Sequence, residues 1–78
     1  PIVAKTNSGK IVAGFCKFSD SKIKKSELNK FLDELKSENI SADIIVIFAK
    51  GGFSSELKNL KNENLKLFSV KSLKALVQ

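Results

Sequence analysis

A continuous apolar run, Ile44-Ile45-Val46-Ile47-Phe48-Ala49, constrains the fold of this chain more than any other feature. The run is rich in β-branched residues, which favour strands, and it is too short for an independent helix. A strand that shows no polar alternation is typical of a buried strand in a parallel sheet. The sequence therefore predicts an α/β domain in which residues 44–49 form an inner strand.

Two further strands are predicted before this run. Residues 2–6 and 11–18 are strand-like, and the connection Asn7-Ser8-Gly9-Lys10 is typical of a tight turn, so we expect a β-hairpin. The second strand carries apolar residues on both of its faces. We therefore expect this strand to be central and covered on both sides.

Helical spacing of apolar residues separates the predicted strands. The first set predicts an amphipathic helix of about four turns, with caps among residues 19–21 and a stop at Asn39. A second, short helix is expected after Gly51-Gly52, with Ser54 or Ser55 as its cap. The residues that carry the spacing are Ile23, Leu28, Phe31, Leu32 and Leu35 in the first helix, and Phe53, Leu57 and Leu60 in the second.

The C-terminal third completes the predicted order. Residues 65–70 suggest a short strand with Lys66 pointing outward, and Leu73, Leu76 and Val77 suggest a last helical turn or two. The order is then ββαβαβα, a mixed sheet that starts with a hairpin and has helices packed on it. We expect a single domain over residues 1–78. Because the chain opens on a strand and without Met, we expect it to be the C-terminal part of a longer protein.

Composition excludes several kinds of site. The chain has no His and a single Cys, which rules out zinc sites, Cys–His pairs and Ser–His triads. Cys16 lies within an apolar strand and is expected to be a buried structural thiol in a reducing compartment. There is no signal-peptide pattern and no apolar run long enough to span a membrane, so we expect a cytoplasmic protein without membrane contact.

The charge is +6, and all 14 basic residues are lysines. Lysine neutralises phosphates as a point charge, whereas base readout favours Arg, so any DNA contact should be to the backbone. The alternative is a solvated basic surface without a partner. The six Phe residues fall at core spacings, which argues against a stacking platform. The candidate nucleic-acid-binding residues are Lys17, Lys22, Lys24, Lys25 and Lys50.

The segments Pro1-Ile2-Val3-Ala4 and Gly14-Phe15-Cys16-Lys17-Phe18, followed by a Leu-rich helix and an apolar strand, resemble a known family. It is the C-terminal restriction-endonuclease-like, or PD-(D/E)XK, domain of archaeal-type AAA ATPases. The resemblance implies an Asp at the start of the hairpin and a Glu-x-Lys triplet on its second strand, which together hold Mg²⁺ and activate water. Here Pro1 and Phe15 stand in place of the two acids, and Lys17 alone is retained.

The resemblance therefore implies a non-catalytic accessory domain, without a cofactor, that contacts DNA or the ATPase domain of its parent chain. One alternative is an active Mg²⁺-dependent nuclease whose acids lie upstream or have migrated, for instance to Glu27. Another is a protein-interaction module that binds no nucleic acid. A tautomerase that uses Pro1 as its base is disfavoured by the opening hairpin and by the lack of Arg.

Overall fold

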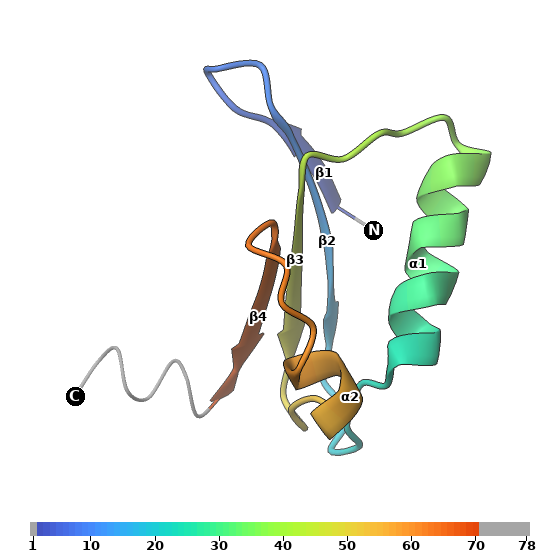
Figure 1. Cartoon of the computed structure of the whole chain (residues 1–78), viewed down its shortest axis with the longest axis vertical. Helices are drawn as coiled ribbons and strands as arrows, with labels where there is room; N and C mark the ends of the chain where they lie inside the picture. The colour runs from blue at the N-terminus through green and yellow to red at the C-terminus, as the bar shows by residue number, and fades with distance from the viewer. Residues whose placement is uncertain (1, 71–78) are drawn as a thin grey trace.

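The computed structural model describes residues 2–70, which form an α/β domain of order ββαβαβ (Figure 1). The last helix expected around Leu73 lies outside these residues. Within them, no helix combines the length and apolarity needed to cross a membrane. The elements are β1 (Ile2–Lys5), β2 (Ile11–Lys17), α1 (Lys25–Ser37), β3 (Ile44–Ala49), α2 (Ser55–Lys58) and β4 (Leu65–Ser69).

The described strands form one mixed sheet in the order β1-β2-β3-β4. The predicted hairpin is confirmed, since β1 pairs antiparallel with β2 and places Ile2 opposite Gly14. The strands β2, β3 and β4 are parallel, with Lys17 opposite Ala49 and Phe48 opposite Phe68. The apolar run is thus an inner strand, as predicted, and the carboxyl ends of β2, β3 and β4 lie at one edge of the sheet.

Helix α1 begins later than the sequence suggested. Its N-cap is Lys24 rather than a serine of residues 19–21, because Ile23 forms a parallel bridge with Phe53 and holds the preceding chain extended. Asn39 follows the helix with a φ of 57°, which confirms the predicted stop. Helix α2 is a single turn, and the Ser54 hydroxyl accepts a hydrogen bond from the Leu57 N–H, as expected for its cap.

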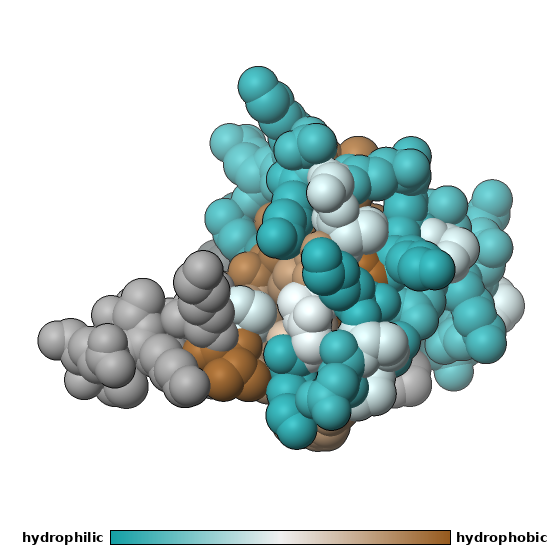
Figure 2. Space-filling view, turned by 90° about the horizontal axis from the view of Figure 1, so that it is seen from below, coloured by the Kyte–Doolittle hydropathy of each residue, from teal (hydrophilic) through white to brown (hydrophobic). Residues whose placement is uncertain are grey.

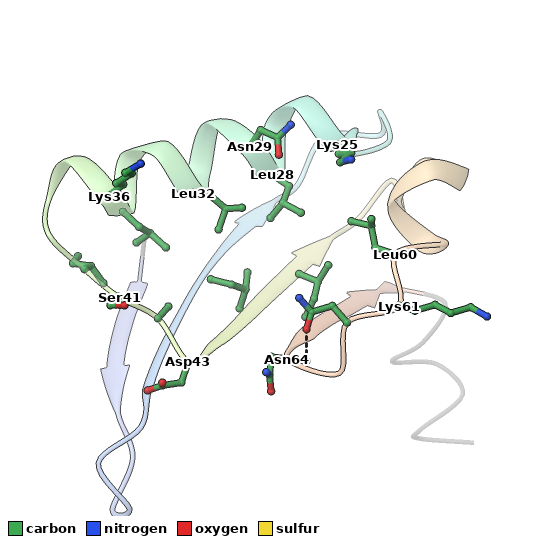
Figure 3. A pocket seen from close by; sticks show the side chains of 16 residues that line it. Lys25, Leu28, Asn29, Leu32, Lys36, Ser41, Asp43, Leu60, Lys61 and Asn64 are labelled. Carbon is green, nitrogen blue, oxygen red and sulfur yellow. Dashed lines mark hydrogen bonds between the residues drawn. The ribbon is translucent and has the colours of Figure 1, made fainter.

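The core lies on one face of the sheet, which we call the covered face. Both helices lie on this side (Figure 3). A right-handed crossover between neighbouring parallel strands places its helix on the same side each time. The buried residues are Ala13, Ile47 and Ala49 from the strands and Ile23, Leu28, Phe31, Leu35, Phe53 and Leu57 from the helices and connections.

The opposite face of the sheet carries no helix among the described residues, and we call it the open face. The expectation that β2 is covered on both sides is therefore wrong for this part of the chain. The thiol of Cys16 is exposed, which also corrects its predicted burial. The residues of the open face, which alternate with those of the core along each strand, are Ile2, Ala4, Val12, Gly14, Cys16, Ile44, Val46, Phe48, Lys66 and Phe68.

Candidate nucleic-acid interface

The structure brings two connections together at the carboxyl ends of the parallel strands. The Lys50 N–H donates to the Lys17 carbonyl, the Ile23 N–H donates to the Gly52 carbonyl, and the Ser54 N–H donates to the Ile23 carbonyl, each at 2.9 Å. Residues 17–25, which lead from β2 into α1, are therefore fixed against residues 50–54, which lead from β3 into α2. We call these two segments the carboxyl edge.

Gly51 allows this close contact between the two connections. A Cβ atom at this position would collide with the backbone carbonyl oxygens of Asp20 and Ser21. The next residue, Gly52, has a φ of 82°, a conformation that glycine adopts without steric cost. The Gly-Gly pair is thus required to pack the two connections together, and its role here is in the backbone.

The predicted lysines all come to the carboxyl edge. Lys17 ends β2, Lys24 and Lys25 begin α1, Lys50 follows β3, and Lys22 lies in the connection between β2 and α1. Figure 2 looks at this end of the molecule and shows hydrophilic residues over most of it. The carboxylates of Asp20 and Glu27 offset part of the positive charge. Because the lysines outnumber these two acids, the edge remains positive.

The ammonium of Lys17 is engaged within the fold. Its Nζ lies 2.6 Å from Oε1 of Glu27, and Oε2 of the same carboxylate accepts the N–H of Lys24 at 3.2 Å. The hydrogen bond from Lys17 is the main cause that lowers the pKa of Glu27. The Lys24 N–H also lowers this pKa, and desolvation opposes both. Glu27 therefore ties the end of β2 to the start of α1, and Lys17 is less free to meet a phosphate.

The other lysines of the edge remain accessible. Lys50 lies 3.3 Å from Asp20, but the two side chains are 53% and 90% exposed, and such surface pairs hold their partners weakly. Lys22 and Lys24 are exposed. The accessible positive charge therefore comes mainly from Lys22, Lys24 and Lys50, with Lys25 half-buried beside them.

The position of the expected catalytic triplet holds an aromatic contact. Phe15 and Lys17 point to the covered face, where the Phe15 ring lies 4.8 Å from the Phe31 ring at 53°. Glu27 is the carboxylate paired with Lys17, and the described residues contain no cluster of three potential ligands for a metal ion. These residues do not fit the Mg²⁺ site that the resemblance implies, because a hard cation needs several oxygen ligands.

A separate cavity of about 650 Å³ lies between α1 and the connection from α2 to β4 (Figure 3). It exists because α2 is a single turn and leaves the amino ends of β3 and β4 uncovered. Leu28, Leu32 and Leu60 point into it. Asp43 is the acidic residue among those that line the cavity. Its Oδ2 accepts a hydrogen bond from the Ile11 N–H at 2.8 Å. Lysines also line the cavity, but among the described residues none of them forms an ion pair with Asp43.

An aromatic row lies on the open face and was not predicted. The spacing of the Phe residues predicts that all of them lie in the core, but Phe18 is 71% and Phe68 is 37% exposed. Phe48 lies between them, opposite Phe68 in the sheet and 6.2 Å from the Phe18 ring. The available signal was strand alternation: Phe18 lies an odd number of residues from Ala13, and Phe48 an odd number from Ile47, which places both rings on the face opposite the core.

The family of this chain is not shown by comparison with known proteins. No protein-family model, curated protein or solved structure matches the chain. What is established is a small α/β domain with a mixed four-stranded sheet.

Proposed function

We propose that this chain is a non-catalytic, endonuclease-like accessory domain that contacts the phosphates of DNA through its carboxyl edge. The observation that carries the proposal is the convergence of Lys22, Lys24 and Lys50 from two connections that are hydrogen-bonded to each other. Fixed lysines at one edge neutralise neighbouring phosphates together and release their counterions. The overall charge of +6 supports the same partner.

Lys17 is paired with one carboxylate, that of Glu27, and no group of three potential metal ligands lies among the described residues, which supports a role in binding rather than catalysis. Metal-assisted hydrolysis of a phosphodiester needs ligands for the metal and a group that activates water. Phe15 and Phe31 contact each other and line a cavity of about 310 Å³ beside Lys17, and Glu27 is neutralised by Lys17 itself. Because no three potential ligands gather beside Lys17 in the part of the chain that the structure describes, the arrangement favours contact with a phosphate backbone over its cleavage.

The proposal is tested by the salt dependence of duplex binding. We expect a labelled DNA duplex to bind at about 50 mM salt and to be released as salt rises, because each phosphate contact contributes a slope of about −0.9. The triple variant Lys22→Gln, Lys24→Gln, Lys50→Gln should lose affinity, and its slope should become shallower by about 2 to 3. Fluorescence anisotropy measures both quantities.

The matched control removes the same charge from the other end of the sheet. Lys5→Gln, Lys10→Gln, Lys36→Gln changes the residues at the hairpin turn and at the end of α1. If binding reflects only the net charge, both triple variants will weaken it equally, and the carboxyl edge will not be the interface. DNA nicking in Mn²⁺ that Lys17→Ala abolishes would instead support the nuclease alternative.

A second candidate function is protein contact without nucleic-acid binding. The exposure of Ile2, Phe18 and Phe68 on the open face favours it, because large exposed apolar patches mark interaction surfaces. This alternative requires that neither duplex nor single-stranded DNA binds at low salt. The same anisotropy titrations therefore separate it from phosphate contact.

A further inference from the structure

We infer that the open face binds single-stranded nucleic acid, with unpaired bases stacking on the row formed by Phe18, Phe48 and Phe68. The inference rests on the proposed function, because phosphate contacts at the carboxyl edge would guide the nucleic-acid strand onto this face. It names single-stranded nucleic acid as the substrate class. It also reverses the expectation from the sequence that no stacking platform exists. That expectation depended on burial of every Phe, and the structure exposes two of the three rings in this row.

The three rings lie side by side near the carboxyl ends of three neighbouring strands. Phe68 of β4 is the register partner of Phe48 of β3, so their Cβ atoms lie roughly 5 Å apart. On the other side of Phe48, the Phe18 ring lies at a centroid distance of 6.2 Å and is tilted by 50°. Phe18 stands just beyond the end of β2, with 71% of its surface exposed. The row therefore presents aromatic surface beside the lysines of the carboxyl edge.

The charge of this face suits a polyanion. Lys66 of β4 is exposed, and it lies two residues before Phe68 on the same face. The strands contribute no acidic side chain to the open face among the described residues. Lys50 follows β3 two residues after Phe48. A nucleic-acid strand that crosses the row would thus meet Lys66 on one side and Lys50 on the other, where it would compete with the exposed carboxylate of Asp20 for Lys50.

A single strand fits this surface better than a duplex. The sheet is roughly 14 Å across, from its four strands at about 4.8 Å spacing, whereas the major groove is about 12 Å wide and admits a helix or a two-stranded ribbon. Bases in a duplex are also stacked on one another and present no free face to Phe. Unpaired bases do present that face, and stacking on an aromatic side chain tolerates any base sequence.

The experiment compares a labelled oligo(dT) of about 12 nucleotides with a duplex of the same length at low salt. We expect Phe18→Ala and Phe68→Ala each to weaken binding of the single strand by about tenfold, in line with the loss of one stacked base. Binding of the duplex to the carboxyl edge should change less than twofold. The variants Phe18→Leu and Phe68→Leu keep the apolar surface, and they should lose nearly as much affinity as the alanines if stacking is the cause.

The matched control is Leu32→Ala. Leu32 is 40% exposed, close to the 37% of Phe68, but it lies on α1 at the other side of the sheet. It should leave both affinities unchanged. Circular dichroism and thermal unfolding of every variant confirm that the fold is retained, which is expected because both Phe side chains are exposed.

The outcomes distinguish this inference from the proposed function. If the Phe variants bind the single strand as the wild type does while the triple lysine variant weakens both ligands, stacking is wrong and phosphate contact stands. If neither ligand binds at low salt, both proposals fail. If the Leu variants retain full affinity, or if the Phe variants abolish only self-association of the domain, the open face is an apolar protein-contact surface and the inference is overturned.

Discussion

The two faces of the sheet differ in what covers them, although both are apolar. On the covered face, Ala13, Ile47 and Ala49 are fully buried beneath the helices. On the open face, the alternate residues of the same strands remain half-buried or exposed, and Ile2 reaches 66% exposure. The comparison shows that apolar character alone does not assign a strand residue to a core. The position of the helices decides it.

The contrast has an energetic consequence. Burial of an aliphatic side chain contributes about 1.5 to 3 kcal/mol relative to its exposed state. The covered face therefore accounts for most of the stability of a small domain such as this one. The exposed side chains of the open face, those of Ile2, Phe18 and Phe68, contribute less to folding and are available for binding.

The largest expected effect comes from truncating the same side chain, isoleucine, on each face of the sheet. Ile47→Ala should lower the free energy of unfolding by about 3 to 4 kcal/mol, because it leaves a cavity at a fully buried site. Ile2→Ala removes the same atoms from the open face and should cost about 0.5 kcal/mol or less. Urea denaturation measures both. Equal losses would mean that the open face is buried in solution.

The second prediction concerns Gly14, a position on the open face that should not tolerate a larger side chain. A Cβ atom on Gly14 would collide with the backbone carbonyl oxygen of Val46 on the neighbouring strand. Gly14→Ala should therefore destabilise the domain by about 2 to 3 kcal/mol, because the strands must move apart. Thermal unfolding tests it, with Gly9→Ala as a control, since Gly9 has open space around its Cβ position and only its φ of 87° to oppose the change. Wild-type stability of Gly14→Ala would contradict the close approach of β2 and β3.

Much of the fold followed from local pattern. The bounds of β3, the hairpin, the stop at Asn39 and the Ser54 cap were all predicted, because each depends on residues adjacent in sequence. The start of α1 was not predicted correctly. Ile23 continues the helical spacing of Leu28 and Phe31, but its bridge to Phe53 is a tertiary contact that overrides the spacing.

The error about the open face has a different origin. Val12 and Cys16 are apolar, a pattern that predicts coverage of β2 on both sides. Apolar residues on both faces of a strand do not indicate how many helices cover each face. The rule of right-handed crossovers, applied to strands that are neighbours in both sequence and space, would have placed both helices on the same side.

The candidate site was predictable in its location but not in its internal contacts. Lys17 and Lys50 come to one edge because parallel strands align their carboxyl ends, which follows from the predicted order. The pairing of Lys17 with Glu27 depends on the position of α1 over the sheet. The exposure of Phe18 depends on the lack of a covering helix on the open face among residues 2–70. Neither is encoded in a local motif.

The smallest expected effect comes from removing the ion pair between Lys17 and Glu27, which lies on the covered face at the carboxyl edge. Glu27→Gln removes the ion pair with Lys17 and weakens the acceptor for the Lys24 N–H. The pair is partly exposed, so screening by solvent should keep the loss of stability at neutral pH below about 1 kcal/mol. Glu34→Gln, on the same helix and exposed, is the control and should change stability less.

The pH dependence of this loss gives the sharper measurement. Because the fold lowers the pKa of Glu27 below its ordinary value of 4.5, the contribution of Glu27 is present above that value. It is lost as the pH falls through the lowered pKa and the carboxylate becomes protonated in the folded state. The difference in stability between wild type and Glu27→Gln should therefore be constant near neutral pH and shrink below about pH 4.5. A difference that persists unchanged at pH 3 would mean that Glu27 acts through packing of its side chain rather than through its charge.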